Sequence, residues 1–146
     1  MNQLDEKDMA IMDVLKENSG LSIQKIAKKT GIPIATVHNR IKRLREGGVI
    51  QRYTIIIDKA KLGRKMTAHI HIKCVPKVDH IALLEKIMKH GLVEDGSAVA
   101  GEYDLLLKVR VKDMEELNEL VLKYLRTYDE ISQTETMIAF RHMEKD

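Results

Sequence analysis

The sequence predicts an α+β protein in which an N-terminal helix-turn-helix domain precedes a C-terminal ferredoxin-like βαββαβ domain. Three segments with helical periodicity come first, and a strand-helix-strand pattern then occurs twice, with an offset of about 36–38 residues. Charge divides the chain in the same way, because residues 1–65 hold 14 Lys and Arg against 7 acids, whereas residues 66–146 hold 11 against 15. We therefore expect a helix-turn-helix domain over 1–49, a linking strand and hinge over 50–65, and a ferredoxin-like domain over 66–146.

The first 49 residues are expected to form three helices. Apolar residues at helical spacing predict a helix over roughly 4–18, with acids in the first turn where the helix dipole favours them. Ser22 is a suitable cap for a second helix over roughly 22–30, and Gly31 can supply a tight turn. Pro33 stands at or beside the start of a third helix, roughly 33–46, where a missing amide costs nothing. Two helices joined by a short glycine turn form a helix-turn-helix.

The third helix is expected to have one apolar face and one polar, basic face. At about 100° per residue, the apolar side carries Ile34, Val37, Ile41 and Leu44. Arg and Asn can bond a base bidentately, and Thr can offer a hydroxyl or a methyl group. The candidate base contacts are therefore Thr36, Asn39 and Arg40. The candidate phosphate contacts are Lys25, Lys28, Lys29, Lys42 and Arg43, and His38 lies toward the flank of the same surface.

A basic three-helix domain could instead bind protein. Residues 21–52 hold eight Lys and Arg against a single acid. That excess favours double-stranded DNA as the partner over a protein surface.

The second half of the chain predicts two strand-helix-strand units. Strands are expected over 66–74, 93–100, 105–111 and 131–141, with one helix from Asp79 to about residue 90. Asp113 and Glu116 resemble a capping box that opens the second helix. Such a fold covers one sheet face with helices, and Leu106, Met137 and Ala139 leave the other face partly apolar. The simplest explanation is that a second copy of the chain packs against that face.

Other function classes find little support in the sequence. A Gly-rich phosphate loop, a His-Glu helix pair and a nucleophile elbow are missing, so neither catalytic residues nor a cofactor is expected. His69 and His71 share a strand face and could ligate a metal, with His80, His90 or His142 as remote candidates. Two histidines do not complete a tetrahedral site, and Cys74 is interpreted as a small core residue, so no metal is expected. Short apolar runs, an acidic start and a single cysteine indicate a cytoplasmic protein without a membrane span.

Several segments resemble the Lrp/AsnC, or feast/famine, family. They are residues 4–11 (LDEKDMAI), 26–33 (IAKKTGIP), 36–44 (TVHNRIKRL), 47–50 (GGVI), 99–107 (VAGEYDLLL) and 134–136 (TET). The resemblance implies a RAM-type C-terminal domain, homodimers that often assemble to octamers, and DNA binding tuned by amino acids. It also implies that the apolar, β-branched linking strand from Ile50 to Ile57 pairs with its mate across a two-fold axis. Pro33 departs from the Ser cap of many members, which leaves side-chain capping open there.

An amino-acid effector needs amide donors for its carboxylate and an acceptor for its ammonium group. By the resemblance, it binds at the junction between dimers. The candidate residues are Gly101, Glu102, Tyr103, Asp104, Thr134 and Thr136. Without the family, these residues would be interpreted as a capped turn beside a solvated threonine strand.

We therefore expect a sequence-specific transcription regulator whose assembly or DNA binding is modulated by a small molecule. Two alternatives remain. Some Lrp-like chains are similar to subunits of sirohaem decarboxylases, although the basic third helix favours regulation. An unspecific architectural DNA-binding protein is the other alternative, because phosphate contacts alone carry no sequence information.

Overall fold

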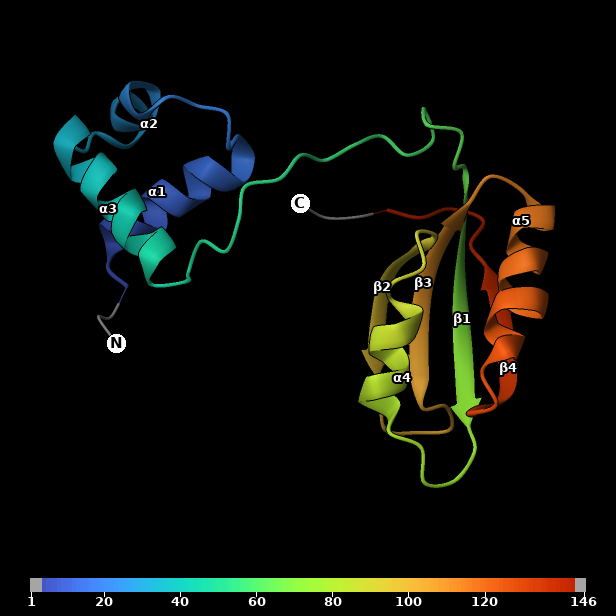
Figure 1. Cartoon of the computed structure of the whole chain (residues 1–146). Helices are drawn as coiled ribbons and strands as arrows, with labels where there is room; N and C mark the ends of the chain where they lie inside the picture. The colour runs from blue at the N-terminus through green and yellow to red at the C-terminus, as the bar shows by residue number, and fades with distance from the viewer. Residues whose placement is uncertain (1–3, 144–146) are drawn as a thin grey trace. The chain divides into compact units, whose positions relative to one another are not determined.

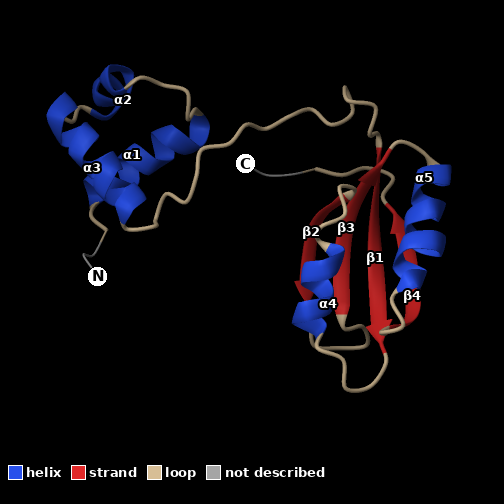
Figure 2. Cartoon of the chain, viewed as in Figure 1, coloured by secondary structure: helices blue, strands red, loops and turns tan. Residues whose placement is uncertain are grey.

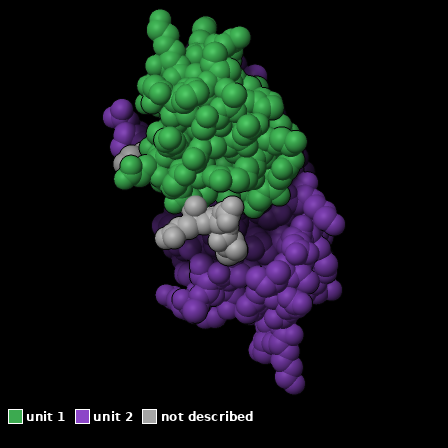
Figure 3. Space-filling model, turned by 90° about the vertical axis from the view of Figure 1, so that its left-hand side faces the viewer, with its two compact units in different colours: residues 1–57, 144–146 green, residues 58–143 purple. Residues whose placement is uncertain are grey.

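The computed structural model describes residues 4–143 of the 146-residue chain. They form two compact units, one through Ile57 and the other over Asp58–Met143 (Figure 3). The division falls inside the segment that was expected to link the domains. None of the described helices is long and apolar enough to cross a membrane.

The first unit is built from α1 (Glu6–Glu17), α2 (Ile23–Thr30) and α3 (Ile34–Glu46) (Figure 1). Asp5 and Asp8 form a reciprocal capping box at the start of α1, and the Ser22 hydroxyl accepts from the Lys25 amide at the start of α2. Pro33 precedes α3 without a side-chain cap. The three helices enclose a small apolar core made of Ile11, Leu15, Ile26, Ala27, Ile32 and Val37.

The turn between α2 and α3 depends on a glycine. Gly31 has φ 70° and ψ 13°, the left-handed conformation that glycine adopts without a steric penalty. Its amide donates to the Ala27 carbonyl and ends α2. The turn separates α2 from α3 by three residues, as a helix-turn-helix requires.

The second unit contains a four-stranded antiparallel sheet with the strand order β2-β3-β1-β4 (Figure 2). The strands are β1 (Met66–Cys74), β2 (Val93–Ala98), β3 (Leu105–Val111) and β4 (Ile131–Ile138). One helix, α4 (His80–Ile87), follows β1, and α5 (Met114–Asn118) follows β3. The chain continues from α5 through a wider π-type turn over Glu119–Tyr124 and a 3-10 turn over Leu125–Thr127. This arrangement confirms the ferredoxin-like prediction.

The helices cover one face of the sheet (Figure 1). Ile70 pairs with Leu107 and Ile72 with Leu105, and all four side chains are buried on the covered face. They pack against helix residues such as Leu83, Ile87, Leu117, Leu120 and Leu125. On the opposite face, His71 is paired with Leu106 and His69 with Met137, so that face mixes apolar and titratable side chains.

Gly96 lets α4 approach β2 closely. A Cβ built on Gly96 would lie 2.8 Å from Leu84 Cδ1 and 2.9 Å from Met88 Sδ. A side chain at this position would therefore require the ends of the Leu84 and Met88 side chains to move.

Several element boundaries differ from the sequence prediction. Asp113 caps α5 by accepting from the Glu116 amide, but the Glu116 carboxylate accepts from the Lys112 amide rather than from the cap residue. The last strand ends at Ile138 instead of residue 141. Ile34, expected on the apolar face of α3, is 53% exposed at the first position of the helix. Within the described chain, residues 51–57 form no β-ladder, and the predicted pairing of this segment requires a second copy.

Candidate nucleic-acid interface and ligand-binding loop

The exposed face of α3 centres on Asn39. Ala35, His38, Asn39 and Lys42 are exposed, whereas Val37 and Leu44 on the opposite face are buried. Thr36 is half-buried at one side of this surface. The helix therefore presents a short amide side chain at its middle and a lysine one turn later.

Arg40 does not lie on this exposed face. It follows Val37 by three positions and precedes Leu44 by four, and both of these residues are buried, so the helix turns Arg40 toward α1. Its Nη1 lies 2.6 and 2.7 Å from the two carboxylate oxygens of Asp5 and 2.8 Å from Asp8 Oδ1. Only 19% of the Arg40 side chain is exposed. In the free chain, Arg40 is therefore bound to α1 and is not presented for base contact.

Asp8 is the fully buried carboxylate of this cluster. Arg43 Nη2 lies 2.5 Å from Asp8 Oδ2, so two arginines of α3 share one carboxylate of α1. The side-chain hydrogen bond from Arg40, followed by the bond from the Asp8 amide, lowers the pKa of Asp5 to about 2. The same bonds from Arg40 to Asp5 and Asp8 raise the pKa of the Arg40 guanidinium, so Arg40 remains charged at neutral pH. We call Asp5, Asp8, Arg40 and Arg43 the α1–α3 ion cluster.

The candidate phosphate contacts differ in their surroundings. Lys25 and Lys28 of α2 are exposed. Lys29 Nζ lies 3.3 Å from Glu17 Oε2, and Lys42 Nζ lies 3.8 Å from Glu46 Oε1. Such exposed ion pairs are weak and can exchange for a phosphate. Arg43 is the exception, since its guanidinium is bound to the buried Asp8 carboxylate between α1 and α3.

The loop from Val99 to Asp104 forms the candidate effector site. The Val99 amide donates to the Asp104 carbonyl, and the Asp104 amide donates to the Ile72 carbonyl, which fixes the loop to β1. Gly101, with φ 155°, and Glu102 are exposed at its tip.

Tyr103 is engaged on the open face of the sheet. Its hydroxyl donates to the Glu135 carboxylate, and its ring meets the His71 ring edge-on, with centroids 5.1 Å apart. The hydrogen bond to Glu135 raises the pKa of Tyr103 to about 12, so the phenol remains a donor.

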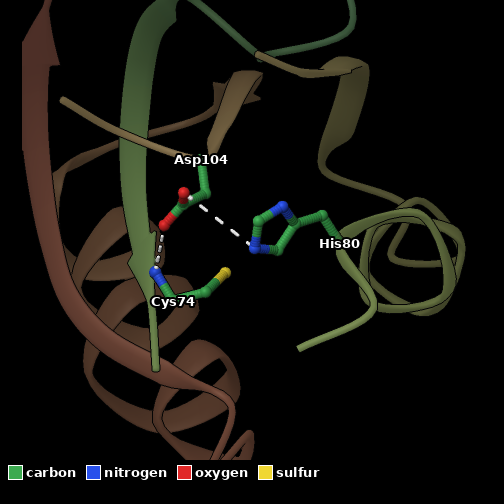
Figure 4. A group of neighbouring side chains, drawn as sticks. All are labelled: Cys74, His80 and Asp104. Atoms are coloured by element: carbon green, nitrogen blue, oxygen red, sulfur yellow. Dashed lines mark hydrogen bonds and ion pairs between the residues drawn. The ribbon is translucent and has the colours of Figure 1, made fainter. Parts of the chain in front are cut away.

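One carboxylate oxygen of Asp104 accepts a hydrogen bond from the backbone, and the other faces a histidine (Figure 4). Oδ2 accepts from the Cys74 amide at 2.7 Å, whereas Oδ1 lies 3.9 Å from His80 Nε2. Burial, together with the carboxylates of Asp104 and Glu130, raises the pKa of the Cys74 thiol.

The six predicted effector residues do not share one surface of a single chain. Thr134 pairs with Ile72 and Thr136 with Ile70, so both threonines lie on the helix-covered face of the edge strand. Glu135 between them points to the open face, where it accepts from Tyr103. A pocket that uses all six residues therefore needs a second chain.

Sequence reasoning missed the partners of these residues. Asp5 and Asp8 were noted only as acids near a helix start, yet they bind arginines 32 to 35 positions away. His80 and Cys74 flank Asp104 without any ligand spacing in the sequence that would reveal it. Glu135, the acceptor for Tyr103, could have been found only from the register of β4 against β1.

Each of the two units matches a known domain family. The Lrp/AsnC ligand binding domain matches residues 67–146, and a winged helix-turn-helix DNA-binding domain matches residues 4–51. An HTH-type transcriptional regulator of Pyrococcus furiosus is 40% identical over 139 residues, which cover 94% of this chain and 93% of that protein. The regulator FL11 of the same organism is 33% identical over 138 residues, covering 94% and 90% of the two chains.

Solved structures share the fold over the whole chain. AsnC of Escherichia coli has a TM-score of 0.89 at 24% identity, covering 99% of this chain and 97% of that one. A feast or famine regulatory protein of Mycobacterium tuberculosis, complexed with L-methionine, has a TM-score of 0.86 at 28% identity and the same coverage. Two domain matches in family order and relatives aligned over nearly the full length lead to one conclusion: this chain belongs to the Lrp/AsnC family of DNA-binding transcription regulators.

Proposed function

We propose that the chain is a sequence-specific regulator of transcription that acts in the cytoplasm as a homodimer, assembling further to an octamer, and responds to an amino acid. The proposed DNA binding rests on the exposed face of α3, where Asn39 is central and Thr36 and Lys42 lie on either side. The N-terminal part of a recognition helix contacts base edges in the major groove. Thr36 and Asn39 are therefore assigned to bases, and Lys25, Lys28 and Lys42 to phosphates.

Arg40 takes a different role in this proposal. Its guanidinium is bound to Asp5 and Asp8, so a base contact would require breaking charged hydrogen bonds. We assign Arg40 to positioning α3 against α1, together with Arg43.

Asn39→Ala is expected to weaken binding to the preferred DNA sequence by about 1–3 kcal/mol while changing random-sequence binding little, because a base contact is lost. Lys28→Ala is the matched control, and it is expected to weaken both DNAs by the same factor and to reduce the salt slope by about 1. The preferred sequence is first selected from a random pool, and affinities are then measured by competition at fixed salt. An equal loss on both DNAs for Asn39→Ala would remove Asn39 from the base contacts.

The same measurements separate the other functions. An unspecific architectural protein would yield no preferred sequence from the pool, because phosphate contacts alone do not discriminate. A subunit of a sirohaem decarboxylase would bind added tetrapyrrole, which absorbance of the purified chain would report.

The amino-acid response is proposed at the 99–104 loop. A related protein from Mycobacterium tuberculosis is described as complexed with L-methionine, and the loop of this chain offers an exposed glycine and the Asp104 carboxylate. Since Thr134 and Thr136 lie on the other sheet face from the Tyr103–Glu135 pair, the pocket is proposed to form between chains. A ligand at such a junction would change how dimers stack, and hence how many DNA half-sites one assembly can hold.

Asp104→Asn is expected to abolish the amino-acid response while leaving affinity for a single operator within about twofold. Asparagine keeps a carbonyl oxygen for the Cys74 amide but removes the charge that an ammonium group needs. A thermal-shift panel of the twenty amino acids, beginning with L-methionine, identifies the stabilising ligand, since a ligand of the folded state raises its stability. Asp95→Asn, which removes an exposed carboxylate from β2, is the control. A full response in Asp104→Asn would exclude Asp104 from the pocket.

A further inference from the structure

Three metal-ligating side chains meet at one end of the sheet (Figure 4). Cys74 is the last residue of β1, His80 is the first of α4, and Asp104 directly precedes β3. The sulfur, one imidazole nitrogen and one carboxylate oxygen all lie within 4.8 Å of one another, and each of the three residues is half-buried.

The separations fit a metal better than they fit direct hydrogen bonds. His80 Nε2 lies 3.9 Å from Asp104 Oδ1, which is too far for a hydrogen bond. Tetrahedral Zn²⁺ with bonds of about 2.0–2.3 Å places its ligand atoms roughly 3.3–3.8 Å from one another. Movements of about 1 Å or less, within reach of side-chain rotation, would bring the three atoms to that spacing.

Neighbouring hydrogen bonds already orient the ligands. The Cys74 amide holds Asp104 Oδ2 at 2.7 Å, which turns Oδ1 toward His80. Asp79 caps α4 by accepting from the amides of Ile81 and Ala82, and this cap sets the helix start that carries His80. Metal sites are commonly supported by such outer hydrogen bonds, which fix the first ligands before the ion arrives.

We propose that Cys74, His80 and Asp104 bind one divalent transition-metal ion of the Zn²⁺ class and leave a fourth coordination position open. A sulfur ligand selects against Mg²⁺ and Ca²⁺, which prefer oxygen, and a mixed S, N, O set suits Zn²⁺ or Co²⁺. Three protein ligands leave room for water or another exchangeable ligand. Metal binding releases the thiol proton, and the thiolate and carboxylate together balance the charge of the ion.

Co²⁺ is the most direct probe, because Cys74 is the only cysteine of the chain. Any thiolate-to-cobalt charge-transfer band in one chain must therefore come from this site. The untagged full-length chain, stripped with a chelator, is expected to bind one Co²⁺ per chain with that band and tetrahedral ligand-field absorption. Stoichiometric Zn²⁺ is expected to displace it.

Variants test each ligand separately. Cys74→Ser is expected to eliminate the charge-transfer band, and His80→Gln and Asp104→Asn to weaken Co²⁺ binding by at least about tenfold. His69→Gln, which changes a histidine on the open sheet face outside the cluster, is the control and is expected to bind Co²⁺ as the parent chain does. Circular dichroism checks that each variant is folded.

Three results would overturn the site: Co²⁺ bound without a thiolate band in the parent chain, a band that survives Cys74→Ser, or unchanged affinity in His80→Gln. The first of these needs no variant, so it remains decisive if a substitution prevents folding. Asp104 is assigned to both sites, whereas Cys74 and His80 are not among the residues proposed to hold the amino acid. An amino-acid response that persists in Cys74→Ser but fails in Asp104→Asn would therefore distinguish the two sites.

Discussion

Replacing both Arg40 and Arg43 with alanine is expected to lower the free energy of unfolding of the N-terminal unit by about 3–5 kcal/mol, because a buried carboxylate then loses its cationic partners. Asp8 is fully buried, and its two oxygens each bind one of these arginines. Hydrogen exchange of the α1 and α3 amides, measured by mass spectrometry on the full chain without DNA, reports the loss in this unit alone.

A matched variant tests the electrostatic explanation. Asp8→Leu combined with Arg40→Met removes the buried charge together with one of its two arginine partners, and such replacements are often close to neutral. This double variant should therefore exchange much as the parent chain does, although it loses the same Arg40 contacts. If the Arg40→Ala/Arg43→Ala chain also exchanges like the parent, Asp8 does not depend on these arginines and the α1–α3 ion cluster is not what holds α3.

Ile55→Lys with Ile56→Lys is expected to convert the protein to monomers and to weaken binding to a two-half-site operator by about 100-fold or more. The two isoleucines are 77% and 78% exposed in the single chain, although β-branched apolar residues are typical of paired strands. If the segment pairs with its mate, as the proposed dimer requires, four lysines would meet in one interface. Loss of a hot-spot residue at the centre of an interface costs about 2 kcal/mol or more, and 1.4 kcal/mol is a tenfold change in affinity.

Sedimentation equilibrium measures the assembly, and the same operator competition measures the affinity. Leu62→Lys is the control, because Leu62 is also an exposed apolar residue, at 65%, but lies in the turn that follows the linking strand Ile50 to Ile57. The control is expected to remain a dimer. A dimer of unchanged affinity in the Ile55→Lys/Ile56→Lys chain would exclude residues 50–57 from the interface.

Most of the secondary structure could be predicted from the sequence because its causes are local. Ser22 and Asp79 each cap a helix by accepting hydrogen bonds from amides two or three residues later in the chain. Gly31 adopts the left-handed conformation that ends α2. Period-two alternation located β1 to the residue, since Ala68, Ile70 and Ile72 on one face of that strand are buried. The four-stranded sheet followed from the repeated strand-helix-strand order.

The irregular positions could not be predicted in this way. Helical periodicity identifies the centre of a face well but not the exposure of residues at the helix end or at the edge of a face. Ile34, the first residue of α3, is therefore more exposed than expected, and Arg40, at the edge of the buried face, is less exposed. The second helix of the sheet domain widens into a π-type turn at Glu119, and the regular spacing of its apolar residues does not predict this change.

The sequence by itself therefore determined the fold class, the helix caps and a polar, exposed face of α3 that includes Asn39, because each depends on residues within a few positions of one another. Only the tertiary structure decided which partners the charged side chains bind. Arg40 binds Asp5 from 35 positions away, and Asp104 meets the Cys74 amide from 30 positions away. A charged side chain takes whichever partner the packing of helices and strands brings within about 3 Å, and no local pattern records that choice.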